Sequence, residues 1–251
     1  MQENQYSFKK RVVKMENDGM VIKASFRACA IDDRKKFYKS TCILPISVGQ
    51  PVHENEKFFA TLKLINSKFK RCTLLVDDTI QRFTLQIGNP TLTIDKAYKQ
   101  AIELGDLWMK RNQHIYTQLT IPYTIKRWDY WRNLPEYITC YKKVEEFYNN
   151  DAQYKQAIHD NVEEFVTRCI QRLNVDKIDK DQAFNNCLLY LKEECAVMSL
   201  WMKDKYDFEV YPAGRNKAMS ATYEKIIKPA NPDLLRSVAL RFKKHHNLLT
   251  T

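Results

Sequence analysis

The chain has 251 residues and a formal net charge of +11, from 41 Lys and Arg against 30 Asp and Glu. Its 44% hydrophobic and 12% aromatic content is too apolar for a disordered chain and, at this length, sufficient for a sizeable core. The five glycines stand apart in the sequence, which excludes the closely spaced glycines of a Walker A loop, a dinucleotide-binding turn or a nucleophile elbow.

The excess of basic residues favours an anionic partner, usually nucleic acid, because each phosphate contact releases a counterion. A basic surface that only aids solubility explains the charge equally well at this stage. The seven cysteines form no C-x-x-C pair and no Cys/His quartet with zinc spacing, so we expect reduced thiols and no metal site. Residues 1–14 lack the apolar core of a signal peptide, and no run of roughly 18 apolar residues occurs, so we expect a cytoplasmic protein.

The first half of the chain alternates strand and helix patterns. In chain order we expect a polar N-terminal arm over 1–18, a strand over 20–29, a basic turn at 34–36, a strand over 42–46, a helix over 53–69, and a strand over 72–78 followed by a helical stretch. The strand at 42–46 is a short apolar run, and the strand at 72–78 is apolar up to the polar residues that end it. Two such units in succession predict a mostly parallel sheet covered by helices on both faces.

The second half is predicted to be mainly helical. The expected elements are a helix over 93–115, a strand over 121–125, helices over 134–148, 152–173 and 181–203, a strand over 206–211, and a helical tail over 218–251. No internal repeat and no low-complexity linker interrupts the pattern. We therefore expect a single α/β domain over residues 19–251.

Polar side chains follow three of the expected strands. Ser47 precedes Gly49, Asp77 and Asp78 end the 72–78 strand, and Tyr211 ends the last strand before a proline. Ligands of open α/β sheets bind at the carboxyl ends of the strands, so these positions are candidates for a site. The alternatives are a helix N-cap for Ser47, helix caps for the two aspartates, and a strand terminator at Tyr211.

The helix over 181–203 carries a Tyr-x-x-x-Glu pair. Tyr190 and Glu194 stack at i, i+4 on the border of its apolar stripe, where a side chain can point into a pocket. An ordinary surface contact between the two would have the same spacing. Residues 128–131, which hold two tryptophans and a tyrosine between basic residues, could stack nucleic-acid bases or form core beneath a loop.

Taken together and in order, these motifs resemble the tRNA-dependent cyclodipeptide synthases over residues 43 to about 215. The resemblance rests on five segments: Ile43-Leu44-Pro45-Ile46-Ser47-Val48-Gly49, the 66–77 stretch ending in Val76-Asp77, Leu134-Pro135-Glu136-Tyr137, Tyr190-Leu191-Lys192-Glu193-Glu194, and Val210-Tyr211-Pro212. Gln50 and Pro212 resemble the family's XYP subgroup. Gly214 stands where some members carry Asp, so a role for that acid is not carried over.

The resemblance implies a single Rossmann-like domain, a mostly parallel sheet flanked by helices, similar to the catalytic domain of class I tyrosyl- and tryptophanyl-tRNA synthetases. It implies that two aminoacyl-tRNAs are joined into a cyclic dipeptide through aminoacyl-Ser47 and then dipeptidyl-Ser47 intermediates. By resemblance the catalytic residues are Ser47, Tyr190, Glu194, Tyr211 and Tyr137. Glu194 would bind the ammonium of the first substrate, and Tyr190 and Tyr211 would orient the acyl group. Tyr190 would also relay a proton during ring closure, and Tyr137 would support the site. No ATP and no metal is expected, because the aminoacyl ester is already reactive. Enzymes that tailor the product are possible further partners.

The resemblance also assigns binding residues. The substrate-binding candidates are Ile43, Pro45, Gly49, Gln50, Val76, Val197 and Met198. The family's tRNA-binding helix corresponds to 93–112, which is only moderately basic here, so the tRNA-binding candidates include a second group: Lys96, Lys99, Lys110, Arg111, Lys23, Arg27, Arg34, Lys35 and Lys36. Two other functions remain open from the sequence, an RNA-binding protein without activity and a serine esterase that needs no tRNA.

Overall fold

The structure, a computed structural model, describes residues 20–27, 29–173 and 179–246. The expected arm over 1–18 lies outside these residues, and the single-domain expectation stays a prediction. The described elements are β1 (Met20–Arg27), α1 (Ile31–Arg34), η1 (Phe37–Lys39), β2 (Thr41–Ser47), η2 (Pro51–His53), α2 (Asn55–Lys68), β3 (Arg71–Asp77), η3 (Thr79–Gln81), α3 (Arg82–Gly88), α4 (Ile94–Tyr116), β4 (Tyr123–Arg127), α5 (Trp128–Arg132), α6 (Tyr137–Asn150), α7 (Ala152–Leu173), α8 (Lys180–Leu200), η4 (Trp201–Asp204), β5 (Phe208–Tyr211), α9 (Lys217–Thr222), η5 (Tyr223–Ile227) and β6 (Arg236–His246).

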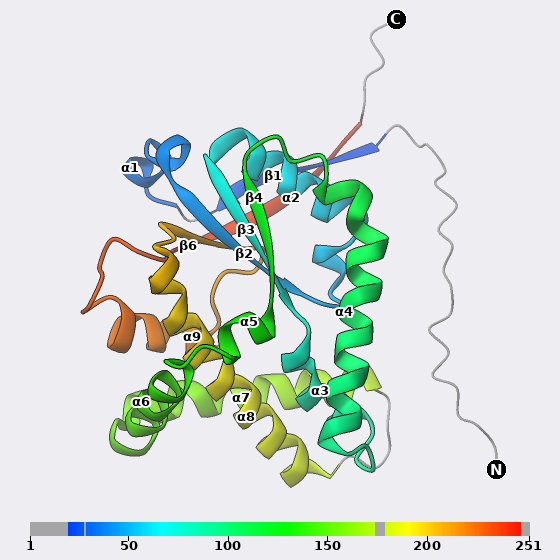
Figure 1. Ribbon diagram of the computed structural model, residues 1–251, viewed down its shortest axis with the longest axis vertical. Coiled ribbons are helices and arrows are strands. Elements are labelled where there is room, and N and C mark those ends of the chain that lie inside the picture. Colours follow the sequence, from blue (N-terminus) through cyan, green and yellow to red (C-terminus); the bar gives the residue numbers. More distant parts are fainter. Residues whose placement is uncertain (1–19, 28, 174–178, 247–251) are drawn as a thin grey trace, which may run out of the picture.

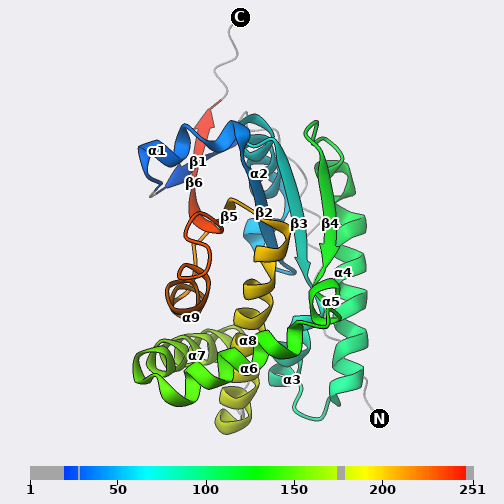
Figure 2. The ribbon, with the colours of Figure 1, turned by 60° about the vertical axis from the view of Figure 1, so that its left-hand side comes forward.

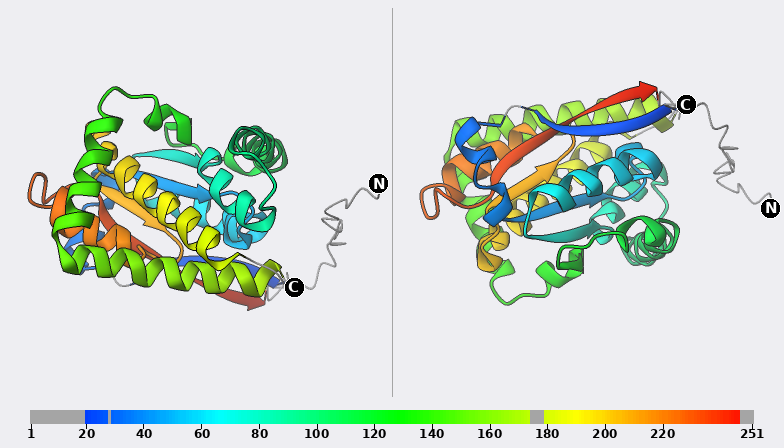
Figure 3. Two further views of the ribbon diagram at one scale, coloured as in Figure 1. Left: turned by 90° about the horizontal axis from the view of Figure 1, so that it is seen from below. Right: turned by 90° about the horizontal axis from the view of Figure 1, so that it is seen from above.

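The strands form a six-stranded sheet in the order β1-β6-β5-β2-β3-β4. Every neighbouring pair is parallel except β1 and β6, which run antiparallel. Helices lie on both faces of the sheet (Figure 1 and Figure 3). The predicted α/β class, a mostly parallel sheet flanked by helices, is therefore confirmed.

Two apolar cores lie on the two faces of the sheet, because successive side chains of a strand point to opposite faces. Leu44, Ile46 and Val76 pack in the core that includes buried residues of α2 and α4, whereas Ile43 and Leu75 pack in the core of α6, α7 and α8. Burial on both sides explains why β2 and β3 are continuously apolar. In Figure 2, α6 and α7 lie at the end of the molecule away from α1, and α8 runs from them toward the sheet.

The prediction of a helical tail over 218–251 is wrong. The helical part of this segment consists only of α9 and the π-helical turn η5. The chain then forms β6, which lies between β5 and β1 in the sheet. Pro229 and Pro232 cannot continue a helix. Beyond them Val238 and Leu240 are buried while Arg241 is exposed, the period of two that belongs to a strand.

Smaller differences concern element ends. The strand expected over 121–125 forms two residues later, as β4, and α8 ends at Leu200, where η4 begins. Residues 128–131 supply core, because Trp128 and Trp131 are fully buried whereas Tyr130 is half exposed. Among the described helices, none is both long and apolar enough to cross a membrane.

Candidate active site

Ser47 ends β2 on the face of the sheet that α8 covers. Its Oγ lies 3.0 Å from the hydroxyl oxygen of Tyr211, at the end of β5. The chain then turns through Gly49, whose positive φ of 83° favours glycine, and the Gln50 N–H donates to the Ser47 carbonyl at 3.1 Å. Gln50, not Ser47, precedes the first turn η2. The alternative that Ser47 is a simple helix cap is therefore wrong.

His53 is a site residue that sequence reasoning missed. The Ser47 backbone N–H donates to His53 Nδ1 at 3.0 Å, and the indole N–H of Trp108 donates to the His53 carbonyl at 3.0 Å. Complete burial lowers the pKa of His53 to about 4, so the ring is neutral and Nδ1 can accept this hydrogen bond. His53 thus holds the Ser47 loop by accepting a backbone hydrogen bond. A sequence signal existed, a histidine six residues after the serine, but nothing in the pattern distinguished it from the other four histidines.

Tyr190 and Glu194 lie on the side of α8 that faces the carboxyl ends of the strands. The Asn216 side chain donates to Glu194 Oε2 at 3.0 Å. Burial raises the pKa of Glu194 to about 7, with a further contribution from the charge of Glu209, and the Asn216 hydrogen bond opposes the shift. Burial and the nearby Glu194 also hold the pKa of the Tyr190 hydroxyl well above its usual range. A carboxyl with a pKa near 7 can hold or accept a proton at neutral pH.

These side chains border one cavity of about 690 Å³. Its chemistry-bearing walls come from the ends of β2, β3 and β5, from α8, and from the loop before α9: Ser47, Asp77, Tyr190, Glu194, Tyr211 and Asn216. Burial raises the pKa of Tyr211 to about 12, so its hydroxyl stays protonated and can donate or pass on a proton. The volume is of the size that small-molecule ligands occupy.

The substrate-binding candidates divide into two groups. Pro45 and Gln50 line the cavity. Gly49 does not line it, and neither do Ile43, Val76, Val197 and Met198, which are fully buried in the two cores. The strand pleat turns Val76 to the opposite face of the sheet from Ser47, and α8 is packed on most sides, so the residues one turn beyond Glu194 are enclosed. For these five positions the assignment to substrate binding stays a prediction.

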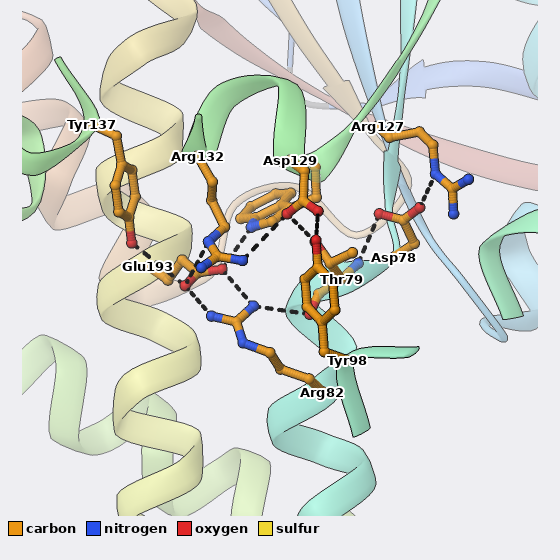
Figure 4. A network of polar contacts seen from close by, with 10 residues as sticks. Asp78, Thr79, Arg82, Tyr98, Arg127, Asp129, Arg132, Tyr137 and Glu193 are labelled. Carbon is orange, nitrogen blue, oxygen red and sulfur yellow. Dashed lines mark hydrogen bonds and ion pairs between the residues drawn. The ribbon is translucent and has the colours of Figure 1, made fainter. Parts of the chain in front are cut away.

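Tyr137 also lies away from the cavity, in a polar network around Glu193 (Figure 4). Its hydroxyl donates to Glu193 Oε2 at 3.4 Å. The Trp128 indole N–H donates to Glu193 Oε1 at 2.8 Å, and Arg82 forms a bidentate ion pair with the same carboxylate. Tyr137 therefore contacts the residue that precedes Glu194 on α8, which is compatible with the expected supporting role. That role stays a prediction.

The two aspartates after β3 have different environments. Asp78 accepts the Thr79 N–H at 2.7 Å and pairs with Arg127, so it is the predicted cap. Asp77 is 4% exposed, lines the cavity, and has an Oδ1 with no hydrogen-bond partner among the described residues. The interpretation of Asp77 as a cap was wrong.

The tRNA-binding candidates lie in two groups near the two opposite edges of the sheet, which are formed by β4 and β1 (Figure 2). The first is on α4, at the β4 side, where Lys96, Lys99 and Lys110 are exposed and Arg111 pairs with Glu54. The second group, on β1 and around α1, is exposed as well: Lys23, Arg27, Arg34, Lys35 and Lys36. Within the described ranges no group of three His, Cys, Asp or Glu side chains is placed to hold a metal ion.

No family model and no curated relative matches the sequence. Solved structures do. A CDPS, a cyclodipeptide synthase, from Fluoribacter dumoffii is 53% identical with a TM-score of 0.87, over 90% of this chain and 100% of that one.

Two more distant structures share the fold. One is the cyclodipeptide synthase from Candidatus Glomeribacter gigasporarum bound to Phe-tRNAPhe, at 17% identity and a TM-score of 0.67 over 79% of this chain and 86% of that one. The other is a Mycobacterium tuberculosis protein whose structure demonstrates that cyclodipeptide synthetases are related to type I tRNA synthetases. It is 9% identical with a TM-score of 0.58, over 91% of this chain and 94% of that one. On the Fluoribacter match, the chain belongs to the cyclodipeptide synthase family and is an aminoacyltransferase.

Proposed function

We propose that this chain joins the aminoacyl groups of two aminoacyl-tRNAs into a cyclic dipeptide, with Ser47 as the covalent carrier. The observation that carries the proposal is the position of Ser47 Oγ, 3.0 Å from the Tyr211 hydroxyl and in the wall of a cavity that Glu194 also lines. A nucleophile, a protonated hydroxyl and a carboxyl thus line one cavity.

In the first step Ser47 Oγ attacks the ester carbon of one aminoacyl-tRNA. The new bond joins Oγ to the acyl carbon, the bond to the tRNA ribose oxygen breaks, and the Oγ proton passes to that oxygen. Tyr211 is hydrogen-bonded to Oγ, and with a pKa raised to about 12 by burial it acts as a relay and not as a base. The ester is already activated, so we propose that the reaction needs neither ATP nor a metal ion.

In the second step, the atom balance decides which amine attacks which ester. For the dipeptide to stay on Ser47, the amine of the Ser47-bound residue must attack the ester of the second aminoacyl-tRNA, whose ribose oxygen then leaves. Glu194 holds this amine as an ammonium through a charge-assisted contact, and a pKa near 7 lets it accept one ammonium proton before the nitrogen attacks. A second proton of that nitrogen passes to the leaving ribose oxygen as the peptide bond forms. In the third step the amine of the second residue attacks the Ser47 ester, which closes the ring and frees Ser47.

Several finer assignments belong to the proposal. Gln50 and the Tyr211-Pro212 pair support the assignment of the chain to the XYP subgroup. Pro45 and Gln50 contact the acyl groups, and Tyr190 orients them. The exposed lysines of α4 contact tRNA phosphates, and the cytoplasm, where aminoacyl-tRNA is available, is the site of action. Tailoring enzymes that modify the cyclic product would be later partners.

The test is a trapping experiment. The protein is incubated with aminoacyl-tRNA that carries a labelled amino acid, quenched in acid, and analysed for label on protein and for cyclic dipeptide. We expect label on the wild type and on Ser67→Ala, a control at an exposed serine of α2, but not on Ser47→Ala. A wild type that binds tRNA without becoming labelled would be an RNA-binding protein. Turnover of small esters without tRNA would indicate an esterase.

A further inference from the structure

The cavity contains acids that the proposed steps do not use. Four carboxyls lie in its walls, Asp77, Glu164, Glu194 and Glu209. Glu164 forms an ion pair with Lys217 at 2.9 Å. Glu209 is neutralised by Arg215, whose Nε donates to it at 2.5 Å, and Glu194 accepts from an amide. Asp77 has neither contact, and its buried Oδ1 has no partner within the described part of the chain.

Asp77 is also placed next to the nucleophile. It ends β3 as Ser47 ends β2, and the two residues are paired in the register of these parallel strands. Backbones of neighbouring strands are about 4.8 Å apart, and the pleat turns both side chains to the face that α8 covers. Asp77 thus lies beside the ester that forms on Ser47, whereas Glu194 approaches from the helix layer above it.

An unpaired buried carboxyl is unfavourable in a folded protein unless a ligand or a proton compensates it. Desolvation, with the charges of Glu194, Asp78 and Glu209, holds the pKa of Asp77 well above its usual range. A raised pKa makes the Asp77 carboxylate a stronger proton acceptor than an ordinary aspartate.

The proposed reaction produces two amines in succession at the same cavity. The first belongs to the residue on Ser47 and is assigned to Glu194. The second belongs to the residue added next, and it must reach the Ser47 ester carbon and lose a proton there. From the position of Asp77 beside Ser47, its place in the cavity wall and its lack of a cation partner, we infer that Asp77 is the catalytic base of ring closure. This inference rests on the proposed function.

The step balances as follows. The amine nitrogen of the second residue bonds to the Ser47 acyl carbon, and the bond from that carbon to Ser47 Oγ breaks. One proton leaves the nitrogen for the Asp77 carboxylate, and it ends on Ser47 Oγ. Asp77 and Ser47 both return to their starting states, and no oxidant, reductant or co-reactant is needed.

The experiment measures each intermediate separately in a single turnover. Wild type and Asp77→Asn are mixed with labelled aminoacyl-tRNA and quenched in acid over time. Aminoacyl-enzyme and dipeptidyl-enzyme are separated by intact-protein mass spectrometry, and the released cyclic dipeptide is counted. We expect Asp77→Asn to form aminoacyl-Ser47 at the wild-type rate, to accumulate dipeptidyl-Ser47, and to close the ring on the order of 10²- to 10⁴-fold more slowly, the usual contribution of a general base.

Two further variants make the result decisive. Asp77→Glu keeps the acid and should restore part of the rate, while Asp78→Asn, which removes the structural neighbour, should be less stable but close the ring normally while folded. Ring closure by Asp77→Asn at the wild-type rate overturns the inference, and so does an equal slowing of the first acylation. If the wild type forms no aminoacyl-enzyme, the proposed function fails first, so the two failures are distinguishable.

Discussion

Glu193 and Glu194 are adjacent on α8, yet replacing each by glutamine should have opposite effects on stability. The carboxylate of Glu193 accepts from Arg82 and Trp128, and the side chains of the Arg82 pair are 7% and 5% exposed. An uncharged amide at position 193 would offer one oxygen to these donors and turn an NH₂ group toward the rest. Removing one member of a buried ion pair destabilises by about 3–5 kcal/mol.

For a chain of this length each kcal/mol lowers the melting temperature by about 2–4 °C, so Glu193→Gln should melt about 6–20 °C below the wild type. Glu194→Gln should melt at or above the wild type near pH 8. The pKa of Glu194 rises from 4.5 to about 7 on folding, so ionisation of this group weakens the folded state as the pH rises from 4.5 through 7. Its neutral replacement should stabilise by up to about 3 kcal/mol at pH 8, less the screening by water in the cavity, and by nothing near pH 4.

The assay is thermal unfolding of wild type, Glu193→Gln and Glu194→Gln between pH 4 and pH 8, with Ser47 labelling measured on the same samples. We expect Glu193→Gln to lose stability at every pH and Glu194→Gln to lose labelling or ring closure while its stability advantage grows with pH. Equal melting temperatures for the two variants, or a loss of stability in Glu194→Gln as large as that in Glu193→Gln, would refute the division of roles between the two carboxylates.

Three further predictions concern the Ser47 loop and the tRNA contact. His53→Asn places an oxygen where Nδ1 lies and should keep Ser47 labelling. His53→Leu leaves the Ser47 N–H unpaired, so the protein should lose about 1–3 kcal/mol of stability and should no longer be labelled. Equal labelling of the two variants would contradict the role of His53 in holding the Ser47 loop. Gly49→Ala should destabilise by about 1–2 kcal/mol in denaturant titrations, because the φ of 83° and not a steric clash opposes it, and Gly49→Asn should be milder; equal unfolding midpoints would show that this φ is not required. Lys96→Glu combined with Lys99→Glu should weaken tRNA binding and flatten its salt dependence by about one unit of slope per lost phosphate contact, and an unchanged slope in a filter-binding titration would place the contact elsewhere.

The sequence alone determined the layer architecture and the elements that hold the chemistry. Continuous apolar runs at β2 and β3 required burial on both faces, which in turn required helices between parallel strands. The spacing of Tyr190 and Glu194 was enough to put them on one side of α8, since four residues return a helix nearly to its starting direction. These features depend on residues close together in the chain, and local geometry decides them.

Tertiary structure decided which of the polar residues do what. Ser47 and Tyr211 are 164 positions apart and meet because β5 pairs with β2. Glu193 and Glu194 differ by one residue, about 100° around the helix, and that rotation sends one carboxyl to Arg82 and the other into the cavity. Asp77 and Asp78 are also adjacent, at the end of a strand, and their carboxyls have different surroundings. No local pattern distinguishes the two, because the role of a carboxyl follows from the cations, donors and solvent around it. Those neighbours come from distant segments, which only the folded chain brings together.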